Sequence, residues 1–325
     1  MAETTSQPLR GLYTAVITPF DSSGRLALEH VPAVLRFQEA AGVDGVVVGG
    51  TNGEGTSLSV GERQALLEKV IEERGRLEVV AGVGAASVSD AVELARHASR
   101  AGAQAVLALP PFFYKAPAPH GLARYFQKLL DAAALSTLLY HIPQFSAVDI
   151  SDDLLDLLLC HPCLTGIKDS SGDWKHTLAY VQRYAGLRIF SGSDRLASAA
   201  YLNGCAGAIS GGANAFPEVV SRIRQEANAQ GGGPAHSRSD PGTIGAGGSQ
   251  QCEGPDALQA AQQRMNALID ITSQYPLIAV SKSVLANRGL PRMHVRPPLV
   301  DLSPTQEARL MQELRSAGYM PETTA

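Results

Sequence analysis

The sequence contains few of the features that place a protein at a membrane, on nucleic acid or outside the cell. No apolar run in its 325 residues approaches the ~18 residues of a membrane-spanning helix. Residues 1–8 are polar, with neither the apolar core of a secretory signal nor the arginines of a transit peptide. The formal net charge of −4 gives no electrostatic reason to bind nucleic acid or an anionic membrane. We therefore expect a cytoplasmic protein with no nucleic-acid and no membrane partner.

Motifs for several common chemistries are also missing. The four cysteines include one C-x-x-C, Cys160 and Cys163, but no second pair that would complete a metal site. No predicted strand is followed by G-x-G-x-x-G, no G-x-S-x-G occurs, and no group of His, Asp or Glu has the spacing of metal ligands. We therefore expect no metal and no other cofactor.

Short apolar runs alternate with helical patterns along the first two thirds of the chain. The runs lack the polar/apolar alternation of a half-exposed strand, so they predict strands that are buried on both faces. Eight such runs occur, at residues 12–19, 45–49, 79–83, 105–109, 137–140, 165–168, 187–190 and 207–210. Alternation with helices predicts parallel βαβ units. Eight units favour an α/β fold of the (β/α)8 TIM barrel type over a doubly wound open sheet.

The composition divides the chain into three parts. Residues 1–10 form a leader that we expect to be flexible, and residues 11–216 form the barrel. Residues 217–325 carry helical patterns and predict a C-terminal helical appendage. Within it, residues 230–255 are rich in Gly, Ser and Pro, a composition that buries too little apolar surface to order itself. We expect that insertion to be disordered.

A single lysine, Lys168, stands on the sixth apolar run. Burial disfavours the charged form of a lysine, and a neutral amine is a nucleophile toward carbonyl carbon. A structural role is also open, because Lys168 can pair with Asp169 or extend its amine to the surface. The residue by itself does not decide between the two.

Two further segments converge with Lys168, since active sites of (β/α)8 barrels lie at the carboxyl ends of the strands. Tyr140 ends the fifth run and is either a general acid/base or a core tyrosine with a satisfied hydroxyl. The loop Gly50–Gly55 after the second run either binds an anion through its N–H groups or makes a tight turn. His141 and Asp169 are next along their strands and should point away from the lumen.

Three motifs in this order resemble a known superfamily. They are Gly50-Thr-Asn-Gly-Glu54, Tyr140-His-Ile-Pro143 and Gly166-Ile-Lys-Asp169. Together they resemble the dihydrodipicolinate synthase/N-acetylneuraminate lyase superfamily of pyruvate-dependent class I aldolases. The resemblance covers residues 11–319 apart from the insertion at 230–255.

The resemblance implies a role for each matched residue. Lys168 forms a Schiff base with pyruvate or a 2-keto acid, and Tyr140 shuttles protons to and from the adduct. Thr51 hydrogen-bonds Tyr140, and the N–H groups of Thr51 and Asn52 hold the substrate carboxylate. The implied substrate site also includes Gly50, Phe145, Ser170, Gly192 and Ile209. The implied partners are pyruvate or a 2-keto acid and a small aldehyde, in a homotetramer built as a dimer of dimers.

Two departures from the synthase pattern bear on the substrate. Phe145 stands where the synthases carry an arginine that binds the carboxylate of aspartate semialdehyde, and phenylalanine cannot form that pair. The relay tyrosine that synthases donate across a subunit interface corresponds to Phe113 or Tyr114.

Two other segments resemble the aldolases of this superfamily. Ser191-Gly-Ser-Asp194 is similar to 2-keto-3-deoxygluconate aldolases, and Pro297-Pro-Leu299 is similar to 4-hydroxy-2-oxoglutarate aldolases. We therefore expect a lyase that joins or separates pyruvate and an aldehyde. A dihydrodipicolinate synthase, a Schiff-base hydratase or dehydratase, and a non-catalytic 2-keto-acid-binding barrel remain alternatives.

Overall fold

Eight parallel strands close into a barrel in the order in which they occur in the sequence. The computed structural model describes residues 9–232 and 255–320. Each strand pairs with the next, and the eighth pairs with the first. The strands are β1 (Gly11–Ala15), β2 (Gly45–Val48), β3 (Glu78–Gly82), β4 (Ala105–Ala108), β5 (Ser136–His141), β6 (Leu164–Asp169), β7 (Arg188–Ser191) and β8 (Gly207–Ser210). The prediction of a (β/α)8 barrel is confirmed.

Helices surround the barrel and extend beyond its last strand. Those between the strands are α1 (Val31–Ala40), α2 (Val60–Glu73), α3 (Val88–Ala101), α4 (Pro119–Ala133), α5 (Pro143–Ser146), α6 (Asp152–Asp156), α7 (Trp174–Arg183) and α8 (Ala197–Leu202). Those after β8 are α9 (Pro217–Ala229), α10 (Pro255–Thr272), α11 (Leu277–Asn287) and α12 (Pro304–Ser316). In the described ranges, no helix is both long and apolar enough to cross a membrane.

Neighbouring residues of each strand belong to two different apolar clusters, as the pleat requires. One cluster joins alternate residues from seven strands and fills the lumen; it includes Tyr13, Val47, Val80, Leu107, Leu138, Phe190 and Ile209. The other packs strands against helices; it includes Leu12, Val46, Val79, Val106, Leu139 and Ile189. Strand β6 contributes a lysine where the others contribute apolar side chains to the lumen.

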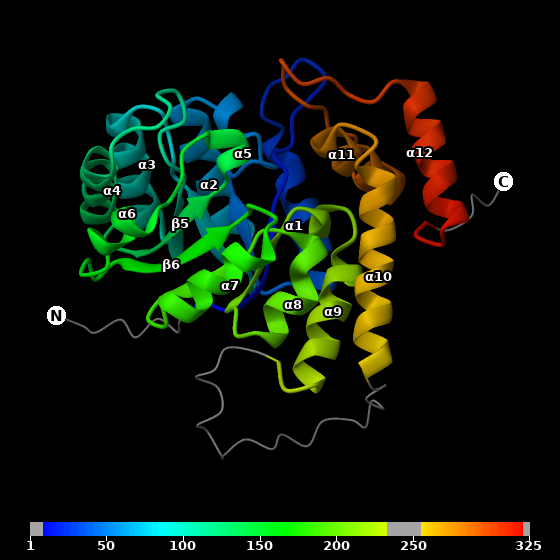
Figure 1. Cartoon of the computed structure of the whole chain (residues 1–325). Helices are drawn as coiled ribbons and strands as arrows, with labels where there is room; N and C mark the ends of the chain where they lie inside the picture. Colours follow the sequence, from blue (N-terminus) through cyan, green and yellow to red (C-terminus); the bar gives the residue numbers. More distant parts are fainter. Residues whose placement is uncertain (1–8, 233–254, 321–325) are drawn as a thin grey trace.

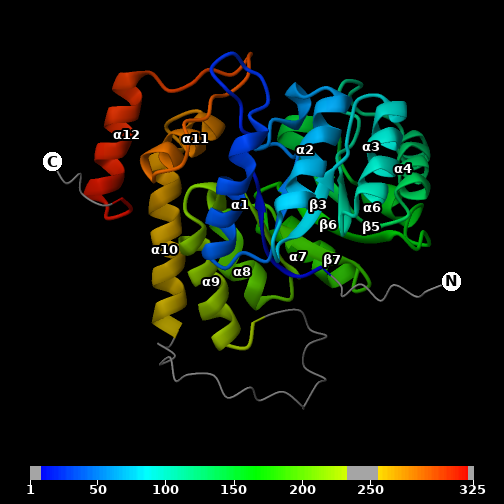
Figure 2. The ribbon, with the colours of Figure 1, turned by 180° about the vertical axis from the view of Figure 1, so that it is seen from behind.

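The three helices after α9 form a group beside the barrel. Helix α10 lies along α8 and α9 in both views (Figure 1 and Figure 2). Its residues Leu258, Met265 and Leu268 are buried. Helix α12 packs against α10 and α11. The C-terminal helices therefore cover one side of the barrel.

Two local features differ from the sequence prediction. Helix α6 ends at Asp156, although the helical sequence pattern that begins at Ser151 continues to Leu159. The short helix α5 directly after β5 was not predicted, although Pro143 at its first position has the φ that a helix start requires. The predicted leader and the predicted insertion lie largely outside the described residues.

Candidate active site

Strand register places Lys168 beside Tyr140. In the parallel pairing of β5 with β6, Tyr140 is the direct partner of Lys168. Each residue is 4% exposed, and the Lys168 Nζ lies 4.1 Å from the centroid of the Tyr140 ring. Phe190 is the partner of Lys168 on β7 and belongs to the lumen cluster. The lysine therefore points into the barrel, next to a tyrosine hydroxyl.

The hydroxyl of Tyr140 has a second polar neighbour on β2's loop. Thr51 Oγ1 lies 3.3 Å from the Tyr140 Oη. Burial by itself raises the pKa of Tyr140, but the positive charge of Lys168 and the hydrogen bond with Thr51 outweigh it and lower that pKa. A lowered pKa raises the fraction of Tyr140 that is phenolate near neutral pH. This suits a residue that takes up and returns a proton.

The loop that carries Thr51 is held by a buried ion pair from the C-terminal helices. Glu54 adopts a left-handed backbone conformation, with φ of 51°. Its carboxylate pairs with Lys282 of α11, and the side chains of Glu54 and Lys282 are 0% and 1% exposed. The same carboxylate accepts the backbone N–H of Arg296 at 2.9 Å. The sequence analysis did not predict these contacts, because more than 200 residues separate the partners.

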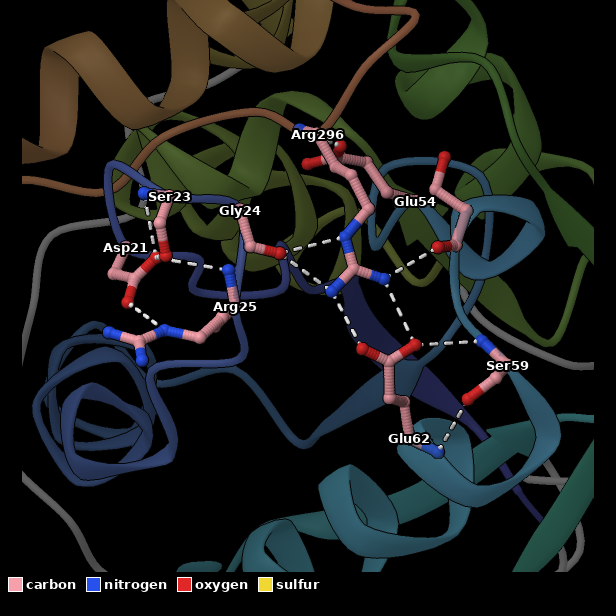
Figure 3. Close-up of polar contacts among 9 residues, drawn as sticks. Asp21, Ser23, Gly24, Arg25, Glu54, Ser59, Glu62 and Arg296 are labelled. Carbon is pink, nitrogen blue, oxygen red and sulfur yellow. Dashed lines mark hydrogen bonds and ion pairs between the residues drawn. The ribbon is translucent and has the colours of Figure 1, made fainter.

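Arg296 extends this anchor to the start of α2. Its guanidinium contacts Glu62 at 2.7 Å and the carbonyl oxygens of Gly24 and Ser57 (Figure 3). Glu62 in turn completes a capping box with Ser59, accepting the Ser59 N–H at 2.9 Å. The loop after β2 is thus fixed by contacts at Glu54 and Ser57, which follow Thr51.

Strands β7 and β8 complete the surroundings of Lys168. A Cβ added at Gly192 would lie 1.8 Å from Ser170 Oγ and 3.0 Å from Lys168 Cε, so this position has room for glycine only. Asp194 follows β7, and its Oδ2 accepts the N–H of Gly212 at 2.9 Å. Burial raises the pKa of Asp194 and outweighs that N–H and the charge of Lys168. Asp194 was not among the predicted site residues.

One cavity of about 390 Å³ contains most of the predicted residues. It is lined by Thr51, Asn52, Tyr140, Phe145, Lys168, Ser170, Gly192 and Ile209. Residues that the prediction missed also line it: Asp194 and several side chains of α10 and α11. The predicted site residues all follow strands, and nothing in the helical pattern of α10 indicates that this helix faces the site.

Two predicted residues lie elsewhere. Gly50 lines a neighbouring cavity of about 270 Å³, which shares Thr51, Tyr140 and Phe145 with the first. Arg63 also lines that cavity, where its guanidinium donates to the carbonyl oxygens of Gly82 and Gly84. Tyr114 lines neither cavity.

Phe113 and Tyr114 are exposed on the loop after β4. They are 73% and 76% exposed, and their rings contact each other edge to face, with centroids 5.3 Å apart. A role in the core of this chain is therefore excluded for both. Within the described residues, Tyr114 does not reach the Tyr140 hydroxyl.

His141, Asp169 and His176 form a cluster on the outer side of β5 and β6. Their possible ligand atoms all lie within 4.8 Å of one another, a grouping that the sequence did not predict because His176 belongs to α7. His141 Nδ1 accepts the N–H of Ile150, which leaves the proton on Nε2, and burial lowers the His141 pKa. Since Asp169 already accepts hydrogen bonds, protein contacts account for the cluster without a metal ion. As expected, His141 and Asp169 face away from the lumen.

Fold and site define the chain as a (β/α)8 barrel with a buried lysine and tyrosine paired at the carboxyl ends of adjacent strands. Residues 8–234 match the model of the dihydrodipicolinate synthetase family. The chain belongs to that family.

Curated relatives agree with this assignment. A protein of Chloroflexus aurantiacus named "Uncharacterized DapA-like lyase" is 38% identical over 96% of this chain and 99% of its own. A 4-hydroxy-tetrahydrodipicolinate synthase of Azoarcus sp. is 32% identical over 85% of this chain and 94% of its own. The sequence relationship therefore extends over the barrel and most of the C-terminal helices.

Solved structures share the fold. YagE of E. coli K12, described as a prophage protein of the dihydrodipicolinic acid synthase family in complex with pyruvate, has a TM-score of 0.83 at 24% identity, covering 95% of this chain and 98% of that one. A 2-keto-3-deoxygluconate aldolase of Sulfolobus solfataricus in complex with D-KDPG has a TM-score of 0.82 at 23% identity, covering 94% and 95%.

Proposed function

We propose that the protein is a class I aldolase that cleaves a 2-keto-4-hydroxy acid to pyruvate and an aldehyde, or catalyses the reverse condensation. The observation that carries this proposal is the contact between Lys168 and Tyr140 at the carboxyl ends of β6 and β5. Family membership supports it, since the relative with 38% identity is named a lyase. An amine and a phenol in contact inside one cavity suit covalent catalysis with proton transfer.

The proposed reaction begins at the amine of Lys168. It attacks the C2 carbonyl of the substrate, water leaves, and an iminium forms. Tyr140, as phenolate, takes the proton of the 4-hydroxyl group, and the C3–C4 bond breaks. The electron pair of the C3–C4 bond moves toward the iminium nitrogen, which gives an enamine and a free aldehyde. Tyr140 returns its proton to C3 of the enamine, and addition of water to the resulting iminium releases pyruvate and restores the lysine and the phenolate.

We assign Thr51 two tasks in this reaction. Its hydroxyl hydrogen-bonds Tyr140. We assign its N–H, with that of Asn52, to the substrate carboxylate, because both residues line the cavity. The buried anchor at Glu54 keeps this loop in place. Gly192 leaves the space beside Lys168 Cε that a bound keto acid requires.

A substrate of the aldolase type is favoured over aspartate semialdehyde. Phe145 lines the cavity where a carboxylate-binding arginine would be needed. The proposed substrates are therefore closer to those of 2-keto-3-deoxygluconate and 4-hydroxy-2-oxoglutarate aldolases. The second candidate is a 4-hydroxy-tetrahydrodipicolinate synthase, because curated relatives at 29–32% identity carry that name.

Reductive trapping tests the proposal. The protein is incubated with pyruvate and borohydride, and its peptides are mapped by mass spectrometry. We expect a reduced pyruvate adduct on Lys168, its loss in Lys168→Ala, and its retention in Lys175→Ala, which removes an exposed lysine on α7. A wild-type protein that gives no adduct contradicts the proposal.

We also propose that the protein is a homotetramer in which Phe113 and Tyr114 lie at a subunit interface. The two rings are large, apolar and more than 70% exposed in the single chain, which is typical of an interface. Sedimentation of wild type and Phe113→Arg distinguishes the outcomes: the variant should dissociate, and an unchanged tetramer argues against this interface.

A further inference from the structure

The cavity that contains Lys168 has a polar buried end and a mouth at which two large apolar side chains stand beside polar ones that are bound within the protein. Lys168 and Tyr140 lie at its buried end, and each is 4% exposed. Phe145 and Leu277 line the same cavity but are 66% and 51% exposed, so they mark its mouth. Large apolar side chains exposed at the mouth of a cavity indicate an apolar ligand group.

The wall between the two ends comes from the C-terminal helices and is mostly apolar. Helix α10 contributes Met265, Leu268 and Ile269, and α11 contributes Val280. Met265 and Leu268 are each 1% exposed, so their positions are fixed by packing. This wall faces the part of a substrate that extends from the lysine toward solvent.

The hydroxyl groups on this wall are directed to their own helices. Thr272 Oγ1 donates to the carbonyl oxygen of Leu268 at 3.0 Å, and Ser281 Oγ donates to that of Leu277 at 3.3 Å. Their donors are thus already used. A polyhydroxylated substrate would find no free hydroxyl donor on these two residues and would replace only part of its hydrogen bonds to water, which is costly.

Among the described residues that line the cavity, no cation other than Lys168 is without a carboxylate partner. The charged residues that line the cavity are Lys168, Asp194 and Arg195. Arg195 pairs with Asp270 at 2.5 Å, and its side chain is 45% exposed. A second carboxylate on the substrate would therefore lack the partner that a buried charge requires.

We propose that the aldehyde half of the substrate is apolar, so that the enzyme joins pyruvate to an aliphatic or aromatic aldehyde. This inference rests on the proposed aldolase function and names the substrate class for that site. The keto-acid half occupies the polar end, and the group carried on C4 contacts Phe145, Leu277 and the wall of α10. The C4 hydroxyl lies between them, near Tyr140, and the bond changes are those of the aldol reaction given above.

An aldehyde panel tests the inference. Initial rates of C–C bond formation with pyruvate are measured for benzaldehyde, 2-methylpropanal, D-glyceraldehyde and glyoxylate. We expect kcat/KM for the first two to exceed that for the last two by about tenfold or more, the discrimination that an apolar pocket provides. Equal or higher values for glyceraldehyde or glyoxylate overturn the inference.

A variant pair connects the preference to the cavity mouth. Phe145→Arg should lower kcat/KM for benzaldehyde and raise it for glyoxylate, while pyruvate trapping at Lys168 is retained. Leu159→Arg is the matched control, because Leu159 is an exposed leucine outside the cavity, 40% exposed. An unchanged preference in Phe145→Arg contradicts the inference.

The two proposals fail in different ways. A protein that traps no pyruvate on Lys168 contradicts the aldolase function itself. A protein that traps pyruvate and condenses it with polar aldehydes retains that function and contradicts only the apolar substrate class.

Discussion

Lys282 of α11 and Glu54 of the loop after β2 form an ion pair that is closed to solvent. Lys282 Nζ also donates to the carbonyl oxygen of His294 at 2.6 Å and lies 4.6 Å from the centroid of the Phe20 ring. Burial lowers the pKa of Lys282, and the charge of Glu54 opposes that effect only in part. The pair joins the C-terminal helices to the loop that carries Thr51.

Removal of one partner should destabilise the protein more than removal of both. Lys282→Met leaves the Glu54 carboxylate buried without a cation, so we expect the free energy of unfolding to fall by about 3–5 kcal/mol. The double variant Lys282→Met/Glu54→Gln should regain part of that loss. Urea unfolding measures the stability of wild type, the single variant and the double variant, with the exposed Lys175→Met as control. A single variant as stable as wild type contradicts the prediction.

Loss of the Thr51 hydroxyl should move the pH–rate profile to higher pH. The hydrogen bond from Thr51 stabilises the Tyr140 phenolate and so lowers its pKa. In Thr51→Val that pKa rises, less phenolate is present at a given pH, and the ascending limb of kcat should shift upward by about one pH unit. Thr51→Ser keeps a hydroxyl and should keep the wild-type profile. A profile unchanged in Thr51→Val argues against the assigned role.

A methyl group at position 192 should block formation of the adduct. The new Cβ of Gly192→Ala would lie 1.8 Å from Ser170 Oγ, so Ser170 or the lysine must move. Because misplacement of a reacting group by about 1 Å can cost about 100-fold in rate, we expect a loss of that order in the rate of pyruvate trapping. Gly186→Ala is the control, since no atom lies within 4 Å of its added Cβ. Wild-type trapping in Gly192→Ala contradicts the prediction.

Replacement of Asp169 should lower the free energy of unfolding by an amount that depends on pH. Burial raises the Asp169 pKa, but hydrogen bonds from Thr177, Ser171 and His176 outweigh it and lower that pKa below 3.8. A folded-state pKa below the unfolded value stabilises the protein above pH 3.8, and this contribution is lost as pH falls through the folded value.

Asp169→Asn should therefore lower the free energy of unfolding by about 1–3 kcal/mol at pH 7, with a smaller difference in acid. Denaturant titrations across pH measure this, and Asp153→Asn on the exposed face of α6 is the control. A difference that is constant down to pH 2 contradicts the assignment.

The sequence by itself determined the barrel and which side chains meet at its centre. Continuous apolar runs separated by helical patterns specify strands buried on both faces, and that pattern is local. The side-chain period of two then puts Lys168 and Tyr140 in the lumen and His141 and Asp169 outside it, as the structure has them.

Only the tertiary structure decided which distant segments complete the site. Three contacts join residues whose local sequence does not indicate that they meet. They are the pair of Glu54 with Lys282, the cavity wall formed by α10, and the stacking of His176 on His141. The exposure of Phe113 and Tyr114 was likewise undecided, because an aromatic residue suits a core and an interface equally. The face of a strand that a side chain occupies follows from short-range periodicity, whereas strand register and the choice of substrate depend on surfaces that meet only when the chain has folded.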